Sequence, residues 1–122
     1  MCKMKFSFNP YNLNRLSIIA GKESVLDTEY FNRCISEIIS NREYTVIELT
    51  KRGFTIPDSK ANFIFAKHNT LSGEEYFNEL RKRNIVVRYF SKERIKDYVR
   101  ITIGSIEQMK ALIKATDEIL KG

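Results

Sequence analysis

The chain has 122 residues, with 21 Lys or Arg against 15 Asp or Glu, so its formal charge is +6. This length fits one compact domain, and 43% hydrophobic with 30% charged residues is ordinary for a globular domain and argues against wholesale disorder. The longest apolar runs are far shorter than the roughly 20 residues of a membrane span. Polar residues also interrupt the apolar stretches near the N-terminus, so no secretory signal is predicted.

The positive surplus is not distributed like a nucleic-acid-binding surface. Basic residues alternate with acids, and the densest basic stretch, residues 81–83, falls at the predicted end of a helix, where cations favour the helix dipole. The two cysteines, Cys2 and Cys34, lack metal-ligand spacing, and Cys34 is predicted to be a buried thiol on an apolar helix face. We therefore expect no nucleic-acid, metal or membrane partner and interpret the chain as cytoplasmic.

The first part of the chain is predicted to be helical. Residues 1–9 show little periodicity and are interpreted as a poorly structured lead or a cloning remnant, with the domain covering residues 10–122. A short helix is predicted from Pro10 to a stop at Gly21.

A much longer helix is predicted next, because apolar residues recur at i, i+3 and i+4 spacing. Asp27 or Thr28 is expected to cap its start, and Gly53 its end. The middle of this helix, residues 41–43, is polar and is expected to lie on the surface or to leave a helix face exposed.

The rest of the chain alternates between strand and helix patterns. Two S-x-x-E/Q sequences, beginning at Ser72 and Ser105, predict helices that start with capping boxes. Short apolar and β-branched runs predict strands at 54–56, 62–66, 85–90 and 98–103. The resulting order, ααββαββα, predicts an α+β fold: a two-layer sandwich of a small, mainly antiparallel sheet with helices on one face.

Two arginines are predicted to lie on the open face of this sheet. In the last strand Ile101 points towards the core and Arg100 away from it, and if the last two strands form a hairpin, Arg88 lies opposite Arg100. Like charges in this arrangement are destabilising, which suggests an anion held between two guanidinium forks. Alternatively, both are solvated surface residues, paired with Glu93 or Asp97.

Other candidate residues give weaker signals. His68, the single histidine, sits in a turn-like stretch with no acid or nucleophile at motif spacing and is interpreted as a loop residue. Five scattered glycines form no phosphate-binding loop. The sequence therefore indicates no self-contained catalytic apparatus.

From about residue 8 to its end, the chain resembles the C-terminal small domain of the histidinol-phosphate aminotransferases, which are pyridoxal-phosphate enzymes of the aspartate aminotransferase fold. The segments that carry the resemblance are PYNLNRLS (10–17), SKANFIFA (59–66), RNIVVRYF (83–90) and DYVRITIGSIEQ (97–108). The resemblance implies that Arg100 binds the substrate α-carboxylate and that Arg88 helps to hold the substrate phosphate. These small anionic substrates are histidinol phosphate, glutamate and 2-oxoglutarate.

The resemblance also implies what the chain lacks. In this family the cofactor is carried by a lysine of an SxSK-like motif in a large domain, and the sequence has no such motif. Lys60 follows Ser59 but precedes a core strand, so we do not assign it that role. We expect the isolated chain to bind no pyridoxal phosphate, to contain no catalytic residue and to be inactive as an aminotransferase.

The function implied for the parent protein is amino-group transfer between histidinol phosphate and 2-oxoglutarate in histidine biosynthesis, by a homodimer. Two alternatives remain open at this point. One is the small domain of a related enzyme, such as threonine-phosphate decarboxylase, and the other is a stand-alone, non-catalytic binding domain.

Overall fold

The computed structural model describes residues 14–122. The chain divides into two compact units, Met1–Cys34 and Ile35–Gly122. The predicted lead over residues 1–9 and the predicted helix start at Pro10 lie outside the described residues.

The first helix ends later than the sequence predicts. Helix α2 (Arg15–Leu26) runs through Gly21, so the prediction that this glycine ends it is wrong. An exposed glycine costs a helix about 1 kcal/mol relative to alanine but does not by itself break it. The break comes at Asp27, whose carboxylate accepts a hydrogen bond from the Tyr30 N–H at 3.1 Å. This contact caps α3 (Thr28–Lys51), as predicted.

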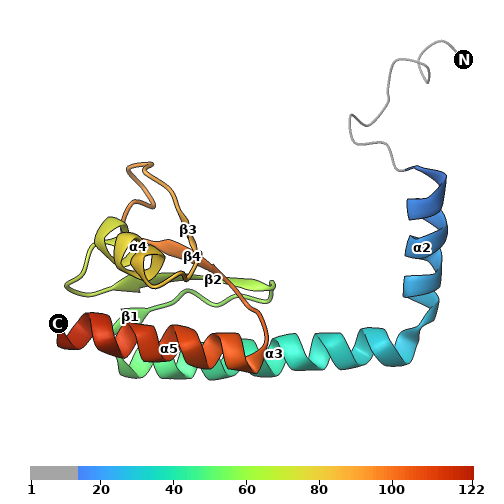
Figure 1. Cartoon of the computed structure of the whole chain (residues 1–122), viewed down its shortest axis with the longest axis horizontal. Helices are drawn as coiled ribbons and strands as arrows, with labels where there is room; N and C mark the ends of the chain where they lie inside the picture. Colours follow the sequence, from blue (N-terminus) through green and yellow to red (C-terminus); the bar gives the residue numbers. More distant parts are fainter. Residues whose placement is uncertain (1–13) are drawn as a thin grey trace, which may run out of the picture. The chain divides into compact units, whose positions relative to one another are not determined.

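The second unit is built on a four-stranded sheet, with helices α3, α4 (Gly73–Lys82) and α5 (Ile106–Lys121) (Figure 1). All neighbouring strands are antiparallel, and their spatial order is β1 (Phe54–Thr55), β2 (Phe63–His68), β4 (Val99–Thr102) and β3 (Arg88–Tyr89). The predicted α+β class and the order ααββαββα are confirmed.

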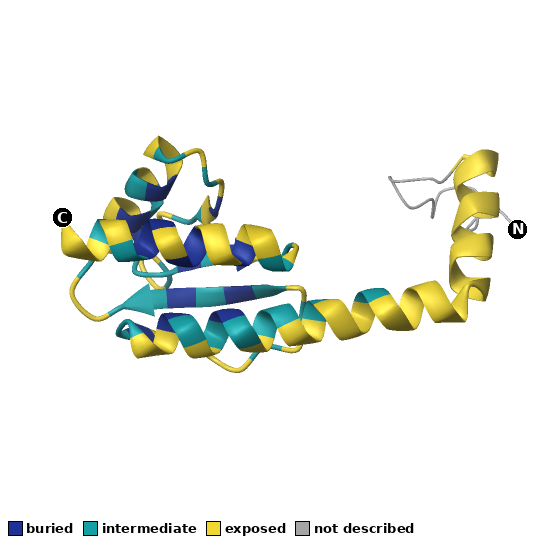
Figure 2. Ribbon diagram, turned by 60° about the horizontal axis from the view of Figure 1, so that its bottom comes forward, coloured by how far each residue is buried: buried dark blue, intermediate teal, exposed yellow. Residues whose placement is uncertain are grey.

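The core lies between the sheet and the helices, where alternate strand residues meet the buried faces of α3, α4 and α5 (Figure 2). Its largest fully buried apolar side chains are Leu49, Ile64, Tyr76, Leu80, Val99, Ile101 and Leu112. The intervening strand residues of β2 and β4 are only partly buried or exposed, which leaves an open sheet face. The candidate site described below lies on this open face.

Strand β3 is shorter than the predicted strand over residues 85–90, because Ile85, the first of these residues, forms part of the C-terminal cap of α4. Asn84 has a left-handed φ of 60°, and the Ile85 N–H donates to the Leu80 carbonyl at 3.0 Å. This is the pattern of a Schellman helix end. Ile85 is therefore tied to the helix, and only Arg88 and Tyr89 pair with β4.

The other helix ends agree with the sequence. Ser72 with Glu75, and Ser105 with Gln108, form complete capping boxes. Gly53, just beyond α3, has a φ of 83°, a conformation that glycine adopts without strain.

Two expectations about α3 need correction. Asn41 and Arg42 are half-buried rather than solvent-facing, because their side chains donate to the carbonyls of Gly104 and Ala61, each at 3.0 Å. Cys34 has a free, half-buried thiol instead of a fully buried one, since this part of α3 leaves apolar neighbours such as Phe31 exposed.

Within residues 14–122, none of the helices combines the length and the apolar character that a membrane crossing needs.

Candidate anion-binding face

Arg88 and Arg100 face each other across β3 and β4. The register pairs Arg88 directly with Arg100 and Tyr89 with Val99, as the sequence predicts. Val99 and Ile101, on either side of Arg100, are buried in the core, so the Arg100 side chain extends to the open face. The two guanidinium groups therefore belong to one side of the sheet.

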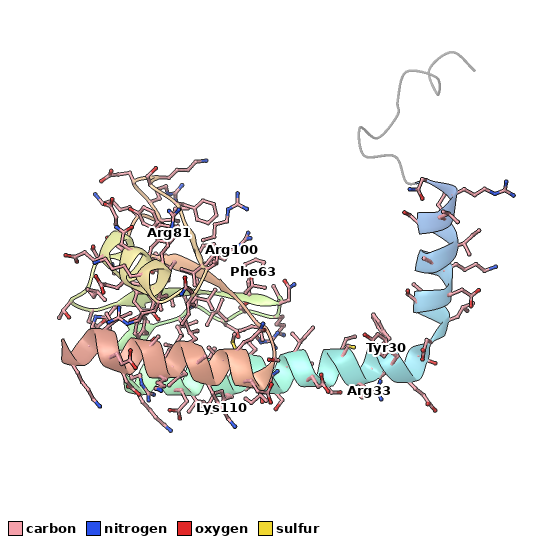
Figure 3. The ribbon with its side chains drawn as sticks, in the orientation of Figure 1. Tyr30, Arg33, Phe63, Arg81, Arg100 and Lys110 are labelled. Atoms are coloured by element: carbon pink, nitrogen blue, oxygen red, sulfur yellow. The ribbon has the colours of Figure 1, made fainter. Side chains whose placement is uncertain are left out.

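Arg100 is half-buried and sits against an aromatic ring (Figure 3). Its guanidinium carbon lies 5.1 Å from the centroid of the Phe63 ring, within the range of a cation–π interaction. Its Nε atom is buried and has no hydrogen-bond partner among the described residues. A buried donor without an acceptor is costly, so this atom has unused capacity to bind an anion.

Arg88 is exposed and has a ring of its own, since its guanidinium carbon lies 5.3 Å from the Phe90 centroid. Neither arginine forms an ion pair with a residue of the described chain. The two acids that the sequence offered as partners are engaged elsewhere: Glu93 binds Lys96 at 2.6 Å and Asp97 binds Lys67 at 3.0 Å. The alternative that Glu93 or Asp97 neutralises the arginines is therefore wrong for this structure.

Aromatic rings fill the space around the pair. Phe65 lies opposite Arg100 in the register of β2 and β4, and its ring is 5.9 Å from that of Phe63 and 6.4 Å from that of Phe90. These rings were not among the residues predicted to form the site. The signal was present, because positions 63 and 65 alternate with the core residues Ile64 and Ala66 and so had to share the face of Arg100.

The remaining candidates have structural roles. The Nδ1 atom of His68 accepts hydrogen bonds from the backbone N–H groups of Thr70 and Leu71, so Nε2 donates to the Arg52 carbonyl at 3.0 Å. Residues 14–122 contain no group of three His, Cys, Asp or Glu side chains suited to a metal ion.

A hollow of about 490 Å³ lies between the segment before β3 and the start of α5, and is lined by Val86, Thr102, Gln108 and Met109 among others. Neither arginine borders it. The open face can bind an anion by charge and by forked hydrogen bonds.

Comparison with known proteins places the chain in one family. Residues 8–115 match the family described as aminotransferase class I and II, and the chain belongs to that family. It is 44% identical, over 118 residues, to a histidinol-phosphate aminotransferase of Clostridium botulinum, a match that covers 97% of this chain and 33% of the relative. The chain thus spans about a third of the length of the curated relatives it matches.

Solved structures of other proteins show the same fold. The crystal structure of the histidinol-phosphate aminotransferase from Clostridium acetobutylicum superposes with a TM-score of 0.83 at 25% identity, covering 98% of this chain and 37% of that one. L-threonine-O-3-phosphate decarboxylase from Porphyromonas gingivalis is also similar, with a TM-score of 0.70 at 27% identity over 98% of this chain and 38% of that one.

Proposed function

We propose that this chain is the C-terminal small domain of a histidinol-phosphate aminotransferase. The parent enzyme would transfer an amino group between histidinol phosphate and 2-oxoglutarate, as a homodimer and with pyridoxal phosphate as its cofactor. In this proposal Arg100 binds the α-carboxylate of glutamate or 2-oxoglutarate, and Arg88 binds the phosphate of histidinol phosphate. The 44% identity to a histidinol-phosphate aminotransferase supports the choice of substrates.

The observation that carries the proposal is the arginine pair itself. Arg88 and Arg100 lie directly opposite each other in the register of β3 and β4, no carboxylate of residues 14–122 forms an ion pair with either, and Arg100 holds a buried, unpartnered Nε. Such a pair is destabilising in isolation but suits a ligand that brings negative charge. A substrate carboxylate or phosphate binds this kind of planar fork through two parallel hydrogen bonds.

The described residues do not fit a pyridoxal-phosphate site. Lys67 of β2, whose ammonium group lies 5.9 Å from the centroid of the Tyr98 ring, already forms an ion pair with Asp97 at 3.0 Å. Rings, rather than an acid or a cup of backbone N–H groups, surround the arginine pair. We therefore assign the cofactor to a large domain beyond this sequence, and to this chain the binding and orientation of substrate anions, with exclusion of water when the domains close.

A second candidate is the small domain of a phosphothreonine decarboxylase, favoured by the similarity to the P. gingivalis enzyme. Its named substrate also carries a carboxylate and a phosphate, so the two arginines suit both reactions. The assay that separates them is incubation of the full-length protein with histidinol phosphate plus 2-oxoglutarate, and separately with threonine phosphate. We expect glutamate to form in the first mixture; carbon dioxide release from the second, without transamination in the first, would select the decarboxylase.

Substitution of the arginines in the full-length enzyme tests their roles. Arg100→Ala should lower kcat/KM for glutamate and 2-oxoglutarate by the equivalent of about 2 to 5 kcal/mol, because a hydrogen-bonded charge pair is lost. Arg88→Ala should act mainly on histidinol phosphate. Lys110→Ala, which removes an exposed charge from α5, is the matched control (Figure 3). Unchanged kinetics in both arginine variants would remove the assignment.

A further inference from the structure

The rings under the two arginines differ from the partners that usually hold a buried or half-buried guanidinium. An acid would neutralise the charge and occupy the in-plane N–H donors. A ring contacts the flat face of the guanidinium and leaves its edges free. Arg100 is held in this second way by Phe63 at 5.1 Å, and Arg88 by Phe90 at 5.3 Å.

The strand register explains how each ring reaches its arginine. On β2 the residue directly opposite Arg100 is Phe65, and Phe63 is the diagonal neighbour two positions along. Diagonal neighbours on one face are within reach of long and aromatic side chains, so the Arg100 side chain extends along the strand over the Phe63 ring. Phe90 instead shares a face with Arg88 because it lies two residues further along the same segment.

The Phe63 ring is itself held in place. The Phe65 ring meets it edge to face, with 5.9 Å between centroids and 87° between planes. Phe65 in turn lies 6.4 Å from Phe90 and 6.5 Å from Tyr98. A fixed ring restricts the guanidinium that rests on it, and restricting a side chain before binding reduces the entropy lost when the ligand arrives.

We infer that Phe63 and Phe90 are separate positioning residues, Phe63 for the carboxylate subsite at Arg100 and Phe90 for the phosphate subsite at Arg88. Each ring orients one guanidinium without using its hydrogen-bond donors, and so sets the affinity for one of the two anions. This inference rests on the proposed function, because it takes the roles of the two arginines from it.

The test is a pair of single substitutions in the full-length enzyme that keep apolar volume and remove the ring. Phe63→Leu should raise KM for glutamate and 2-oxoglutarate about three- to tenfold, the range expected for loss of a partly desolvated cation–π contact, and leave KM for histidinol phosphate unchanged. Phe90→Leu should instead raise KM for histidinol phosphate and leave KM for glutamate and 2-oxoglutarate unchanged. Because the arginines themselves remain, kcat should change little in either variant.

Two further variants keep the test decisive. Phe63→Tyr retains an aromatic face and should restore KM close to the wild-type value, which a purely steric role would not require. Tyr30→Leu removes a ring of α3 that contacts the Arg33 guanidinium instead of Arg88 or Arg100, and should change neither KM.

The inference is overturned if Phe63→Leu raises both KM values equally, if it lowers only kcat, or if Phe63→Tyr behaves like Phe63→Leu. Phe90 follows the short strand β3, outside the buried core, so its variant tests the same idea even if Phe63→Leu folds poorly. If Arg88→Ala and Arg100→Ala are themselves without effect, the proposed function fails. If they act as expected and the ring variants do not, only this inference fails.

Discussion

Arg88 and Arg100 lie directly opposite each other in the register of β3 and β4, and no carboxylate of residues 14–122 forms an ion pair with either. A directly opposed pair of like charges costs a few tenths to about 1 kcal/mol relative to a neutral pair. Cation–π contacts with Phe63 and Phe90 are of similar size and offset part of that cost. The fold thus keeps two positive charges side by side in the absence of their ligands.

A second pair of residues fixes the centre of the core. Tyr76 is fully buried, and its hydroxyl lies 2.7 Å from the Thr116 Oγ1, which itself donates to the Leu112 carbonyl at 2.8 Å. The Tyr76 hydroxyl is therefore the donor of the first bond. Burial raises the pKa of Tyr76 to about 12, so the phenol keeps this proton throughout the ordinary pH range.

Tyr76→Phe should lower the free energy of unfolding by about 1 kcal/mol, the usual net value of one internal hydrogen bond. Urea unfolding of the wild type, Tyr76→Phe, Thr116→Val and the double variant measures it. The double variant should lose less than the sum of the two single losses, because both remove the same bond. Additive losses, or a Tyr76→Phe variant as stable as the wild type, would contradict this account.

At the scale of elements, helix ends decide where strands begin. In the Schellman end at Asn84, the Ile85 N–H bonds to a carbonyl of α4 instead of joining the sheet. Strand β3 therefore has only two paired residues. Those two residues include Arg88, so the short strand still brings this arginine to its partner. At Gly21 the sequence predicts a helix end, but α2 continues through this residue. Nothing at that position competes with the helical hydrogen bonds.

Helices α3 and α5 are joined by an ionic cluster around Arg52. Its guanidinium binds the Asp117 carboxylate through two bonds of 2.6 and 2.9 Å and the Glu48 carboxylate at 2.8 Å. Arg52 lowers the pKa of Asp117, and Lys51 and Arg52 together lower the pKa of Glu48. Both carboxyl groups thus release their protons more readily in the folded chain than in the unfolded one.

The cluster should make stability depend on pH. Because the folded-state pKa values are lowered, the stabilisation is fully present above the unfolded-state values near pH 4 and is lost as pH falls through the lowered ones. Thermal unfolding between pH 6 and about pH 3 should show a smaller acid-induced fall in Tm for Arg52→Gln than for the wild type. Lys114→Gln, which removes an exposed charge of α5 outside the cluster, serves as the control, and equal slopes in all three proteins would refute the role of the cluster.

At the scale of the molecule, the open sheet face is the chemically informative surface. It carries the two arginines and their rings, whereas residues 14–122 contain no group of three His, Cys, Asp or Glu side chains suited to a metal ion. The proposed division of labour follows: this chain binds anions, and a larger part of the parent protein holds the cofactor. The relatives, three times as long, have room for such a part.

Incubation of the purified 122-residue chain with pyridoxal phosphate tests this division. We expect no stoichiometric adduct after borohydride reduction, because Lys67, on the strand next to that of Arg100, is already paired with Asp97. Peptide mapping by mass spectrometry gives the answer. Full modification of one specific lysine would contradict the prediction, and Lys67→Ala would then show whether that lysine is responsible.

Much of the fold could be predicted from the sequence because its signals are local. Capping boxes at Ser72 and Ser105 involve residues three positions apart, and the left-handed end at Gly53 needs only glycine. The opposition of Arg88 and Arg100 also follows from a local rule, since strands joined by a short connection pair symmetrically about its middle.

By itself, then, the sequence determined the element types, their order and the two arginines that share a face. The tertiary structure decided what surrounds them. Phe63 lies under Arg100 only because β2 is the neighbour of β4. Lys67, which is also on β2, forms an ion pair with Asp97, so this carboxylate does not pair with the arginines. These contacts depend on how distant segments pair, which the periodicity of a single strand does not encode.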